Sequence, residues 1–303
     1  MAVPWKDTVN RALRRATGYE LRRVGGPAAR PAAPRRARAR GGDRLLVAPA
    51  FVLSSVRSGS TLLRVLLDSH SQIHAPQELH LRDLTVRQRS KYARRAMTAL
   101  KLDQDQLDYL FWDRLLHREL TAAGKTLLVN KTPSDVFIVD RIRACWPDAR
   151  FIFLLRHPAA IAKSRHATRP QDSVERNNEM VLRYGNAVED ARRRLPGHTV
   201  RYEDLASDPA TETKRLCAFL GVPWEPSMLE YGEHQHGRFK PGLGDWTEKI
   251  RSGRVQPPTP PPPVEEIHPD LRPLCVAWGY LPAPDAGAAG APSGSPAAPE
   301  PAS

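Results

Sequence analysis

A short stretch of hydroxyl, glycine and arginine residues follows the first long apolar run of the chain and has the composition of an anion-binding loop. It reads VRSGSTLL, and its polar, turn-forming and first helical residues are Arg57, Ser58, Gly59, Ser60, Thr61 and Leu62. Gly59 can adopt backbone angles that other residues resist, and a helix beginning near Ser60 offers free N–H groups at the positive end of its dipole. With Arg57 as a cation, the stretch predicts a cradle for an anion, although a serine-capped turn would need the same hydroxyl groups.

A second stretch, FLLRHPAAIAKS, also brings a cation and a hydroxyl group to the end of an apolar run. Arg156 closes that run, and Pro158 is of the type favoured in the first turn of a helix. Ser164 lies eight residues after Arg156, which is about two helical turns along. Arg156 and Ser164 together could hold a second phosphate group, whereas an arginine alone at such a place more often forms a structural ion pair.

The first stretch lacks what a nucleoside-triphosphate loop requires. A Walker loop follows the pattern G-x-x-x-x-G-K-[ST], in which the lysine reaches the phosphates. Here Ser54 replaces the first glycine, Ser60 replaces the lysine, and no later apolar run ends in the aspartate expected to support magnesium. Metal-dependent phosphoryl transfer therefore fits these residues poorly.

Strands and helices that alternate along the chain must position both stretches. Apolar runs predict strands over residues 45–54, 126–130, 150–156 and 198–203, and periodic segments predict helices over residues 61–69, 84–100, 105–122, 134–145, 158–166 and 173–195. The alternation implies crossover connections, so we expect a single α/β domain with a mostly parallel β-sheet flanked by helices. Ligands of such sheets bind at the carboxyl ends of the strands, where both stretches lie.

The basic charge of the chain belongs mainly to its N-terminal segment. The chain has 303 residues and a net charge of +13, but residues 1–44 alone hold twelve Lys/Arg and three acids. The remaining surplus suits an enzyme with an anionic substrate, and no nucleic-acid partner is expected. Residues 1–44 predict a basic amphipathic helix, which packs on the domain or contacts a membrane, and then a disordered linker. Residues 45–281 form the domain, and residues 282–303 form a disordered low-complexity tail.

Cysteine usage and hydropathy bear on the location of the protein. The three cysteines, Cys145, Cys217 and Cys275, are widely separated, match no zinc spacing and fit a reducing compartment. No apolar stretch has the length that spans a bilayer, and the N-terminus lacks the apolar segment of a secretory signal. The expected location is therefore cytoplasmic.

A proline-rich connector over residues 256–269 precedes a final short helix near residues 271–280.

Several motifs, in order along the chain, resemble those of the sulfotransferases that use 3′-phosphoadenosine 5′-phosphosulfate (PAPS). RSGSTLL is similar to their 5′-phosphosulfate loop, and LLRHPAAIAKS to their 3′-phosphate motif, including the Arg-to-Ser spacing. LVNKTP and PDARFIFLLRHP resemble the branch of bacterial and tyrosyl-protein enzymes, and VRYEDLASDPATETKRLCAFLGVPW and FKPGLGDWTEKI resemble later family elements. The resemblance covers about residues 45–280. It implies a P-loop-like fold, PAPS as co-substrate and transfer without a metal.

The resemblance also implies which residues perform the chemistry. Sulfuryl transfer needs a base for the proton of the acceptor hydroxyl and cations for the bridging oxygen. Glu78, in HAPQELHL, matches the glutamate that serves as base in the tyrosyl-protein branch, and His80 is the alternative. Lys131 resembles a lysine that contacts the transferring group, and together with Arg57 it would neutralise charge on the bridge.

Two more residues are implied in nucleotide binding. Tyr202, after the strand that ends in HTV, would stack near the adenosine or touch the 3′-phosphate; without that role it is a core tyrosine at a strand end. Lys240, in FKPGLGDW, matches a family lysine, but Phe239 stands where cytosolic members have an arginine. Arg238 and Arg254 are candidates to replace that arginine.

The acceptor is expected to be a hydroxyl group of a metabolite, a carbohydrate or a phenol, and the residues do not choose among these. Two other functions stay open at this point. One is a kinase or other P-loop NTPase, which the missing lysine and metal ligand disfavour. The other is a non-catalytic protein that binds a nucleotide, or that docks on a membrane or nucleic acid through its basic N-terminal segment.

Overall fold

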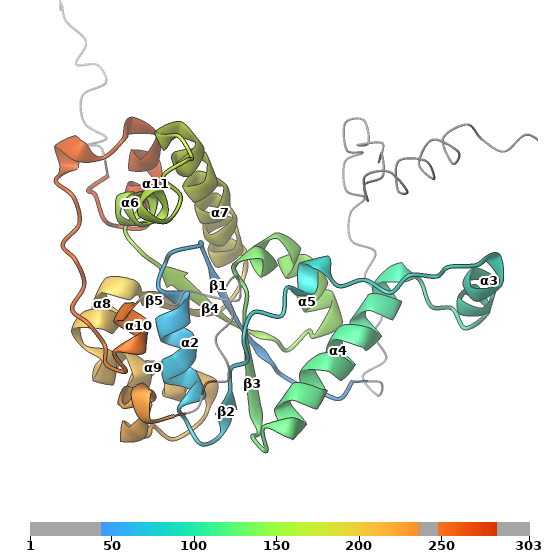
Figure 1. Cartoon of the computed structure of the whole chain (residues 1–303). Helices are drawn as coiled ribbons and strands as arrows, with labels where there is room; N and C mark the ends of the chain where they lie inside the picture. Colours follow the sequence, from blue (N-terminus) through green and yellow to red (C-terminus); the bar gives the residue numbers. More distant parts are fainter. Residues whose placement is uncertain (1–43, 235, 237–247, 284–303) are drawn as a thin grey trace, which may run out of the picture. The chain divides into compact units, whose positions relative to one another are not determined.

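Five parallel strands form the sheet on which the site is built. The computed structural model of the protein describes residues 44–234, 236 and 248–283, which lie within one compact unit of the chain, Arg38–Ser303 (Figure 1). Neighbouring strands pair in parallel, which confirms the predicted α/β class. In the sheet order β2-β3-β1-β4-β5, the strands are β1 Ala50–Ser54, β2 Ile73–His74, β3 Leu127–Lys131, β4 Arg150–Leu155 and β5 His198–Arg201.

Helices cover both faces of the sheet because its central strand is apolar on both sides. Phe51 and Leu53 of β1 join one core, and Ala50 and Val52 join the other, as the period-two alternation of a strand requires. Residues of α4, α5, α7 and α11 complete the first core, and residues of α2 and α9 complete the second (Figure 1). The described α-helices are α2 Ser60–Asp68, α3 Lys91–Ala99, α4 Gln104–Ala122, α5 Val139–Cys145, α6 Pro158–Thr168, α7 Val174–Arg194, α8 Tyr202–Ser207, α9 Pro209–Leu220, α10 Glu248–Arg251 and α11 Arg272–Ala277.

The helix predicted over residues 84–100 forms only in its second half, as α3. The first half is held along α4 by hydrogen bonds that a helix there would have interrupted. Val86 N donates to Asp108 Oδ1 at 2.8 Å, and Trp112 Nε1 donates to Leu84 O at 2.9 Å. Side-chain partners on another helix therefore override the local pattern of this segment.

Two other predicted helices can be compared with the part of the chain that the structure describes. The helix predicted over residues 134–145 begins as a 3₁₀ helix, η2 Pro133–Ile138, and continues as α5. The short final helix near residues 271–280 is confirmed as α11. The predictions for residues 1–43, for residues 237–247 with Lys240, and for residues 284–303 lie outside the described residues. No helix that the structure describes is both long and apolar enough to cross a membrane.

Candidate active site

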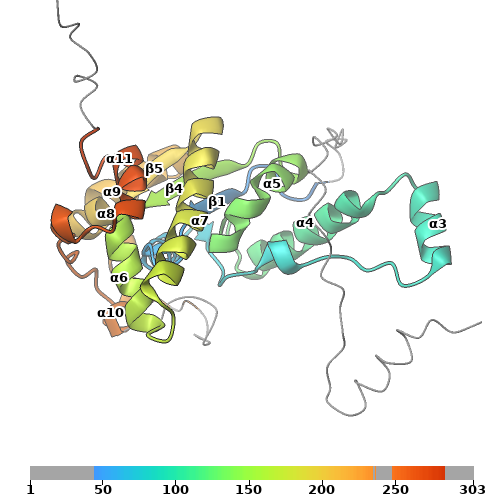
Figure 2. The same cartoon turned by 90° about the horizontal axis from the view of Figure 1, so that it is seen from above.

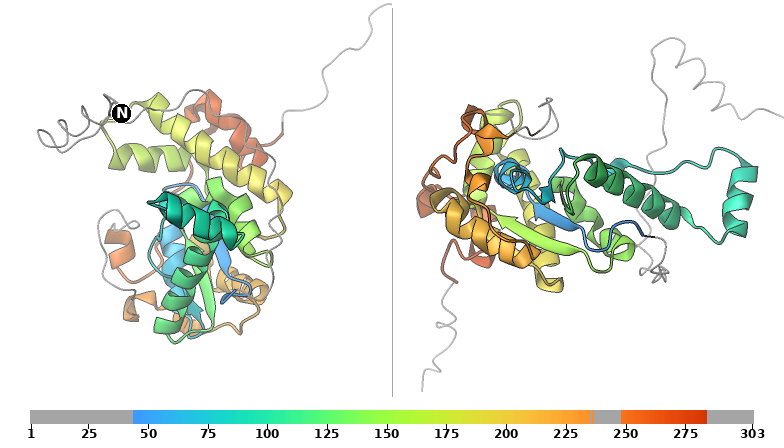
Figure 3. Two further views of the ribbon diagram at one scale, coloured as in Figure 1. Left: turned by 90° about the vertical axis from the view of Figure 1, so that its right-hand side faces the viewer. Right: turned by 90° about the horizontal axis from the view of Figure 1, so that it is seen from below.

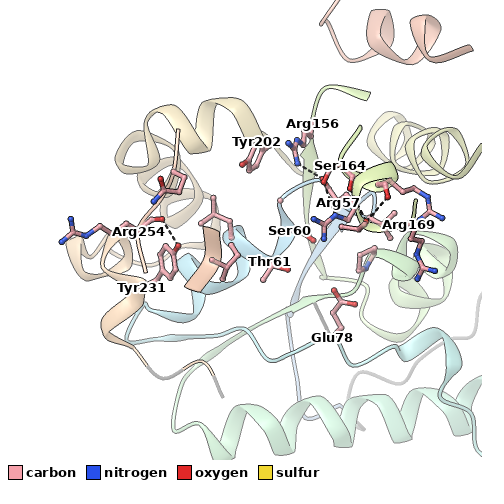
Figure 4. A pocket seen from close by; sticks show the side chains of 18 of the residues that line it. Arg57, Ser60, Thr61, Glu78, Arg156, Ser164, Arg169, Tyr202, Tyr231 and Arg254 are labelled. Atoms are coloured by element: carbon pink, nitrogen blue, oxygen red, sulfur yellow. Dashed lines mark hydrogen bonds between the residues drawn. The ribbon is translucent and has the colours of Figure 1, made fainter. Parts of the chain in front are cut away.

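The residues of both anion-binding stretches line one cavity of about 590 Å³ at the carboxyl ends of β1 and β4 (Figure 4). Five arginines and one glutamate are the charged side chains among the described lining residues, so the cavity suits a ligand with several negative charges. The lining is made by Val56, Arg57, Gly59, Ser60, Thr61, Leu62, Glu78, Pro133, Arg156, Ser164, Arg165, Thr168, Arg169, Gln171, Tyr202, Tyr231, Ile250, Arg254 and Gln256.

The loop between β1 and α2 presents backbone N–H groups to this cavity. Arg57 and Gly59 have left-handed backbone angles, with φ of 64° and 88°, and α2 begins at Ser60 as predicted. No side chain caps the start of α2, so the first N–H groups of the helix have no acceptor within it. Ser58 differs from the prediction: its buried hydroxyl group donates to Ser55 O at 2.7 Å and supports the loop instead of lining the cavity.

Gly59 has no room for a side chain because the ring of Tyr202 lies against its Cα. A Cβ atom at this position would stand 2.2 Å from Tyr202 Cδ2. The other neighbour of the ring is Arg156, whose guanidinium carbon lies 4.4 Å from the ring centroid. Glycine is therefore required here both by the positive φ and by the close approach of Tyr202. The contact also brings the residue after β5 to the anion-binding loop.

Hydrogen bonds join the two anion-binding stretches to each other. Arg156 Nη1 donates to the backbone oxygen of Arg57 at 2.9 Å, and Arg57 Nε donates to Ser164 Oγ at 3.2 Å (Figure 4). Both Arg156 and Ser164 line the cavity, as the spacing of two helical turns predicts. The arrangement can therefore hold two separate anionic groups of one ligand, one at the start of α2 and one at the start of α6.

Glu78 lines the cavity (Figure 4) and is held by a hydrogen bond from Lys131. Lys131 ends β3 and has only 1% of its side chain exposed; its Nζ atom donates to Glu78 Oε1 at 2.5 Å. Lys131 is not among the residues that line the cavity, although the sequence placed it against the transferring group. His80 is not among the residues that line the cavity; its Nε2 atom lies 3.6 Å from Glu78 Oε2, and 38% of its side chain is exposed.

Thr132 fixes the backbone that carries Glu78 and His80. Its Oγ1 atom accepts hydrogen bonds from Leu79 N at 3.2 Å and His80 N at 3.4 Å. The segment therefore follows the end of β3 closely, which explains how a loop residue such as Glu78 obtains a defined position. The motif LVNKTP supplies both supports of this loop, Lys131 and Thr132.

A buried carboxyl group beneath Glu78 was not singled out in the sequence. Asp135, in η2, accepts a hydrogen bond at 2.6 Å from Asn130 Nδ2 of β3. Burial, followed by the negative charge of Glu78, raises the pKa of Asp135 to about 8. Asp135 therefore carries its proton at neutral pH. The only sequence signal was its place one turn after a strand end, which many structural residues share.

The C-terminal part of the domain supports the start of α6. Glu203 Oε1 accepts from His157 N at 3.0 Å, and the Tyr280 hydroxyl group donates to Glu203 Oε2 at 2.6 Å. Burial raises the pKa of Tyr280 and lowers the pKa of His157. The residue after Arg156 is thus tied through Glu203 to the segment after α11, a link that sequence patterns did not indicate.

One wall of the cavity comes from a part of the chain that the motifs indicated only loosely. Tyr231 and Arg254 both line it, and the Tyr231 hydroxyl group donates to Arg254 O at 2.9 Å. Arg254 was one of two candidates to replace the arginine missing before Lys240, and its position in the lining supports that role. Among the described residues, no group of three or more His, Cys, Asp or Glu side chains is arranged to hold a metal ion.

Two curated relatives share sequence with the chain. Nodulation protein NoeE of Sinorhizobium fredii is 32% identical over 216 residues, a match that covers 60% of this chain and 51% of NoeE. Protein-tyrosine sulfotransferase 1 of Danio rerio is 24% identical over 200 residues, covering 60% of this chain and 56% of that protein. The chain therefore spans about half the length of the curated relatives it matches.

Two solved structures share the fold. The sulfotransferase domain of the Synechococcus PCC 7002 olefin synthase superimposes with a TM-score of 0.58 at 24% identity, covering 79% of this chain and 98% of that domain. The sulfotransferase domain from the curacin biosynthetic pathway gives a TM-score of 0.56 at 24% identity, with 78% and 99% covered. The family model described as "Sulfotransferase family" matches residues 49–226, which is more than half of the chain and includes both anion-binding stretches. The chain belongs to the sulfotransferase family.

Proposed function

We propose that this protein transfers the sulfuryl group of PAPS to a hydroxyl group of an acceptor. The observation that carries the proposal is the link between the two anion-binding stretches, in which Arg57 bonds to Ser164 and Arg156 bonds to the Arg57 backbone. A ligand with a 5′-phosphosulfate and a 3′-phosphate has two anionic groups on one ribose, and the cavity offers two adjoining anion sites. The absence of a Walker lysine between them disfavours a nucleoside triphosphate.

The described residues fit this co-substrate in charge and in shape. The uncapped start of α2, with the N–H groups of Ser60, Thr61 and Leu62, would hold the phosphosulfate, and Arg57 would add a cation beside it. Arg156 and Ser164 would hold the 3′-phosphate. Tyr202, packed between Gly59 and Arg156, offers a ring near the ribose and the base. Arg254 adds a further cation on the opposite wall.

Glu78 is placed to act as the base. In the transfer, the acceptor oxygen forms a bond to sulfur, the bond from sulfur to the bridging oxygen breaks, and the acceptor proton passes to the Glu78 carboxylate. Adenosine 3′,5′-bisphosphate leaves with the bridging oxygen and the electron pair of the broken bond. Arg57 and the α2 N–H groups stabilise the charge that develops on that oxygen. Lys131 orients Glu78 through their hydrogen bond. Asp135, whose pKa is raised to about 8, would be protonated at neutral pH and would add no second negative charge beside Glu78.

The acceptor would enter on the side of the cavity where Glu78 lies. Beyond it stands Phe137 of η2, with the guanidinium carbons of Arg82 and Arg183 each 5.0 Å from its ring centroid. The Tyr184 ring meets Phe137 edge-on, with 4.7 Å between centroids. Phe137 and Tyr184 are not among the residues that line the cavity, and two guanidinium groups already cover the Phe137 ring. The two cations, more than the rings, would favour an acceptor with negative charge near its hydroxyl group.

Nucleotide-dependent thermal stabilisation tests the proposal. Adenosine 3′,5′-bisphosphate at a hundred times its dissociation constant should add about 2.7 kcal/mol to the free energy of unfolding. Adenosine 5′-phosphate, which lacks the group that Arg156 and Ser164 would bind, should stabilise much less, and so should ATP with or without magnesium. Stronger stabilisation by magnesium-ATP than by the bisphosphate would reject the proposal in favour of an NTPase.

Activity should be independent of metal. Transfer from PAPS to a phenolic acceptor should continue at an unchanged rate in EDTA, because side chains and backbone N–H groups stabilise the leaving group. Loss of transfer in EDTA, restored by magnesium, would contradict this mechanism.

A further inference from the structure

Helix α3 and its two connections project from the domain and make few packing contacts with its other elements. We call residues 87–102 the α3 arm; residues 84–86 before it are hydrogen-bonded to α4. In Figures 1 and 2, and in the right panel of Figure 3, α3 lies apart from the other helices, beyond the end of α4. None of the residues of α3 is buried, although Ser90 caps its start by accepting a hydrogen bond from Ala93 N at 3.1 Å. A helix with no buried residue leaves its whole surface uncovered.

The surface of α3 is divided cleanly into an apolar and a basic side. At 100° per residue, one side of α3 and its C-cap collects Tyr92, Ala93, Ala96, Met97, Ala99 and Leu100, and the other collects Lys91, Arg94, Arg95 and Thr98. Lys101 follows the helix with a left-handed backbone, at a φ of 60°. The apolar side is exposed: Tyr92 has 67% of its surface accessible and Leu100 has 64%. In a helix that packs on its own domain, this side would be the buried one.

The charge of the α3 arm has one sign. Its six charged residues are Arg87, Arg89, Lys91, Arg94, Arg95 and Lys101, and it contains no Asp or Glu. In the part of the chain that the structure describes, none of these six pairs with a carboxylate; Lys91 instead lies over the Tyr92 ring, 5.3 Å from its centroid. The arm therefore offers six positive charges beside an uncovered apolar strip.

We propose that the α3 arm docks on the surface of an anionic lipid bilayer, with the helix lying in the interface plane. A basic side and an apolar side on one exposed helix are the features that such docking requires. The apolar side enters the boundary between headgroups and acyl chains, and the basic side pairs with anionic headgroups. Docking does not depend on the transfer reaction, and it places the chain segment after Glu78 at the membrane.

Other partners use only part of this surface. A second copy of the chain would bring two sets of six like charges together across a symmetric contact, and a nine-residue helix is too small for a stable dimer interface. A nucleic acid would neutralise the basic side but would leave Tyr92 and Leu100 in water. A lipid surface satisfies both sides at once.

A fluorescent label on each side of α3 in the full chain tests the docking directly. The three native cysteines are buried, so Ala96→Cys on the apolar side and Thr98→Cys on the basic side can each be labelled selectively with a polarity-sensitive dye. On phosphatidylcholine vesicles that contain phosphatidylserine, the dye at position 96 should shift to the blue, and the dye at position 98 should shift much less. Neither should shift on pure phosphatidylcholine. Equal shifts at both positions, or none at position 96, would overturn the proposal.

Affinity for the same vesicles tests the basic side. Arg94→Gln/Arg95→Gln should weaken binding about 30-fold, since each basic residue near an anionic surface contributes about fivefold in affinity. The matched control, Arg114→Gln/Arg143→Gln, removes two exposed arginines from α4 and α5 and should change affinity less than threefold, the scale of about 0.5 kcal/mol expected away from a contact. Equal losses in the two variants would show attraction by net charge alone and would overturn docking through α3.

Substitutions on the apolar side of α3 distinguish binding to a lipid surface from binding to another polyanion such as DNA. Tyr92→Ser/Leu100→Ser leaves all six charges in place and should weaken vesicle binding, while binding to duplex DNA at low salt should not change. If the variant binds vesicles as well as the parent protein does, the arm binds by charge only, and the lipid proposal is wrong.

Discussion

The ammonium group of Lys131 lies 2.5 Å from Oε1 of Glu78 and ties the end of β3 to the loop that follows β2. The carboxylate faces the cavity, whereas the ammonium group is buried behind it. In the proposed mechanism Lys131 would therefore act through Glu78, by orienting that carboxylate. This differs from the direct contact with the transferring group that the motif LVNKTP implied. The pair also makes the stability of the site dependent on both partners.

Removing Lys131 should destabilise the protein more than removing both partners. Lys131→Met leaves the Glu78 carboxylate largely buried without its cation, and breaking such a pair costs about 3–5 kcal/mol. Lys131→Met/Glu78→Gln leaves no unpaired charge and should recover part of this loss in urea unfolding. The exposed control Lys163→Met should stay within about 0.5 kcal/mol of the parent. A double variant less stable than Lys131→Met would argue against the pair.

Glu78→Gln should lower kcat about 10²- to 10⁴-fold with an alcohol or sugar acceptor, because the amide cannot accept the hydroxyl proton. Gln keeps an oxygen that accepts from Lys131 but removes the negative charge beside its buried ammonium group, so the variant should be less stable, whereas the affinity of the folded protein for the bisphosphate should be nearly unchanged. His80→Ala is the matched control, since His80 stands 3.6 Å from the same carboxylate and is more exposed. Steady-state kinetics of the two variants decide the role, and a larger loss in His80→Ala would make the histidine the base.

Arg156→Ala should weaken binding of adenosine 3′,5′-bisphosphate about 10- to 100-fold, measured by calorimetry. Hydrogen bonds to charged groups contribute about 1.5–3 kcal/mol, and Arg156 also holds the backbone of the anion-binding loop. Arg169→Ala removes another arginine from the cavity lining, on the side of Glu78, and should affect the acceptor KM more than bisphosphate affinity. Equal losses of bisphosphate affinity would show that the cavity attracts the ligand by overall charge.

Asp135 should make the folded state less stable as pH rises. Burial raises its pKa to about 8, against about 4 for an aspartate in an unfolded chain. Unfolding therefore releases a proton between these values, and the contribution of Asp135 to the free energy of unfolding falls as pH rises from about 4 to about 8. Asp135→Asn keeps the hydrogen bond from Asn130 but removes the titration.

Thermal unfolding at several pH values measures this effect. Relative to the parent, Asp135→Asn should gain stability steadily from pH 5 to pH 8. The control Asp148→Asn changes an exposed carboxylate, leaves Asp135 intact and should keep the parent profile. A constant difference between Asp135→Asn and the parent at all pH values would refute the prediction.

Local sequence was sufficient to predict the main parts of the anion site. A glycine between hydroxyl residues, soon after an apolar run, can adopt the left-handed backbone of a tight turn before a helix, so the loop at Gly59 and the start of α2 followed from about ten residues. Arg156 directly after an apolar run and Ser164 two turns further along indicated that both face the end of the same strand, and both line the cavity. The alternation of strands and helices was likewise enough to predict the parallel sheet.

Only the tertiary structure decided which of these local parts meet. The contacts of Gly59 with Tyr202, of Lys131 with Glu78, and of Glu203 with Tyr280 all join residues far apart in the chain. The order β2-β3-β1-β4-β5 places the end of β3 beside the loop after β2, and packing of the other elements supplies the remaining contacts. The period of one strand or helix carries no information about that arrangement. The proton on Asp135 and the extended segment before the α3 arm have the same origin, since burial and hydrogen-bond partners are supplied by other elements of the fold.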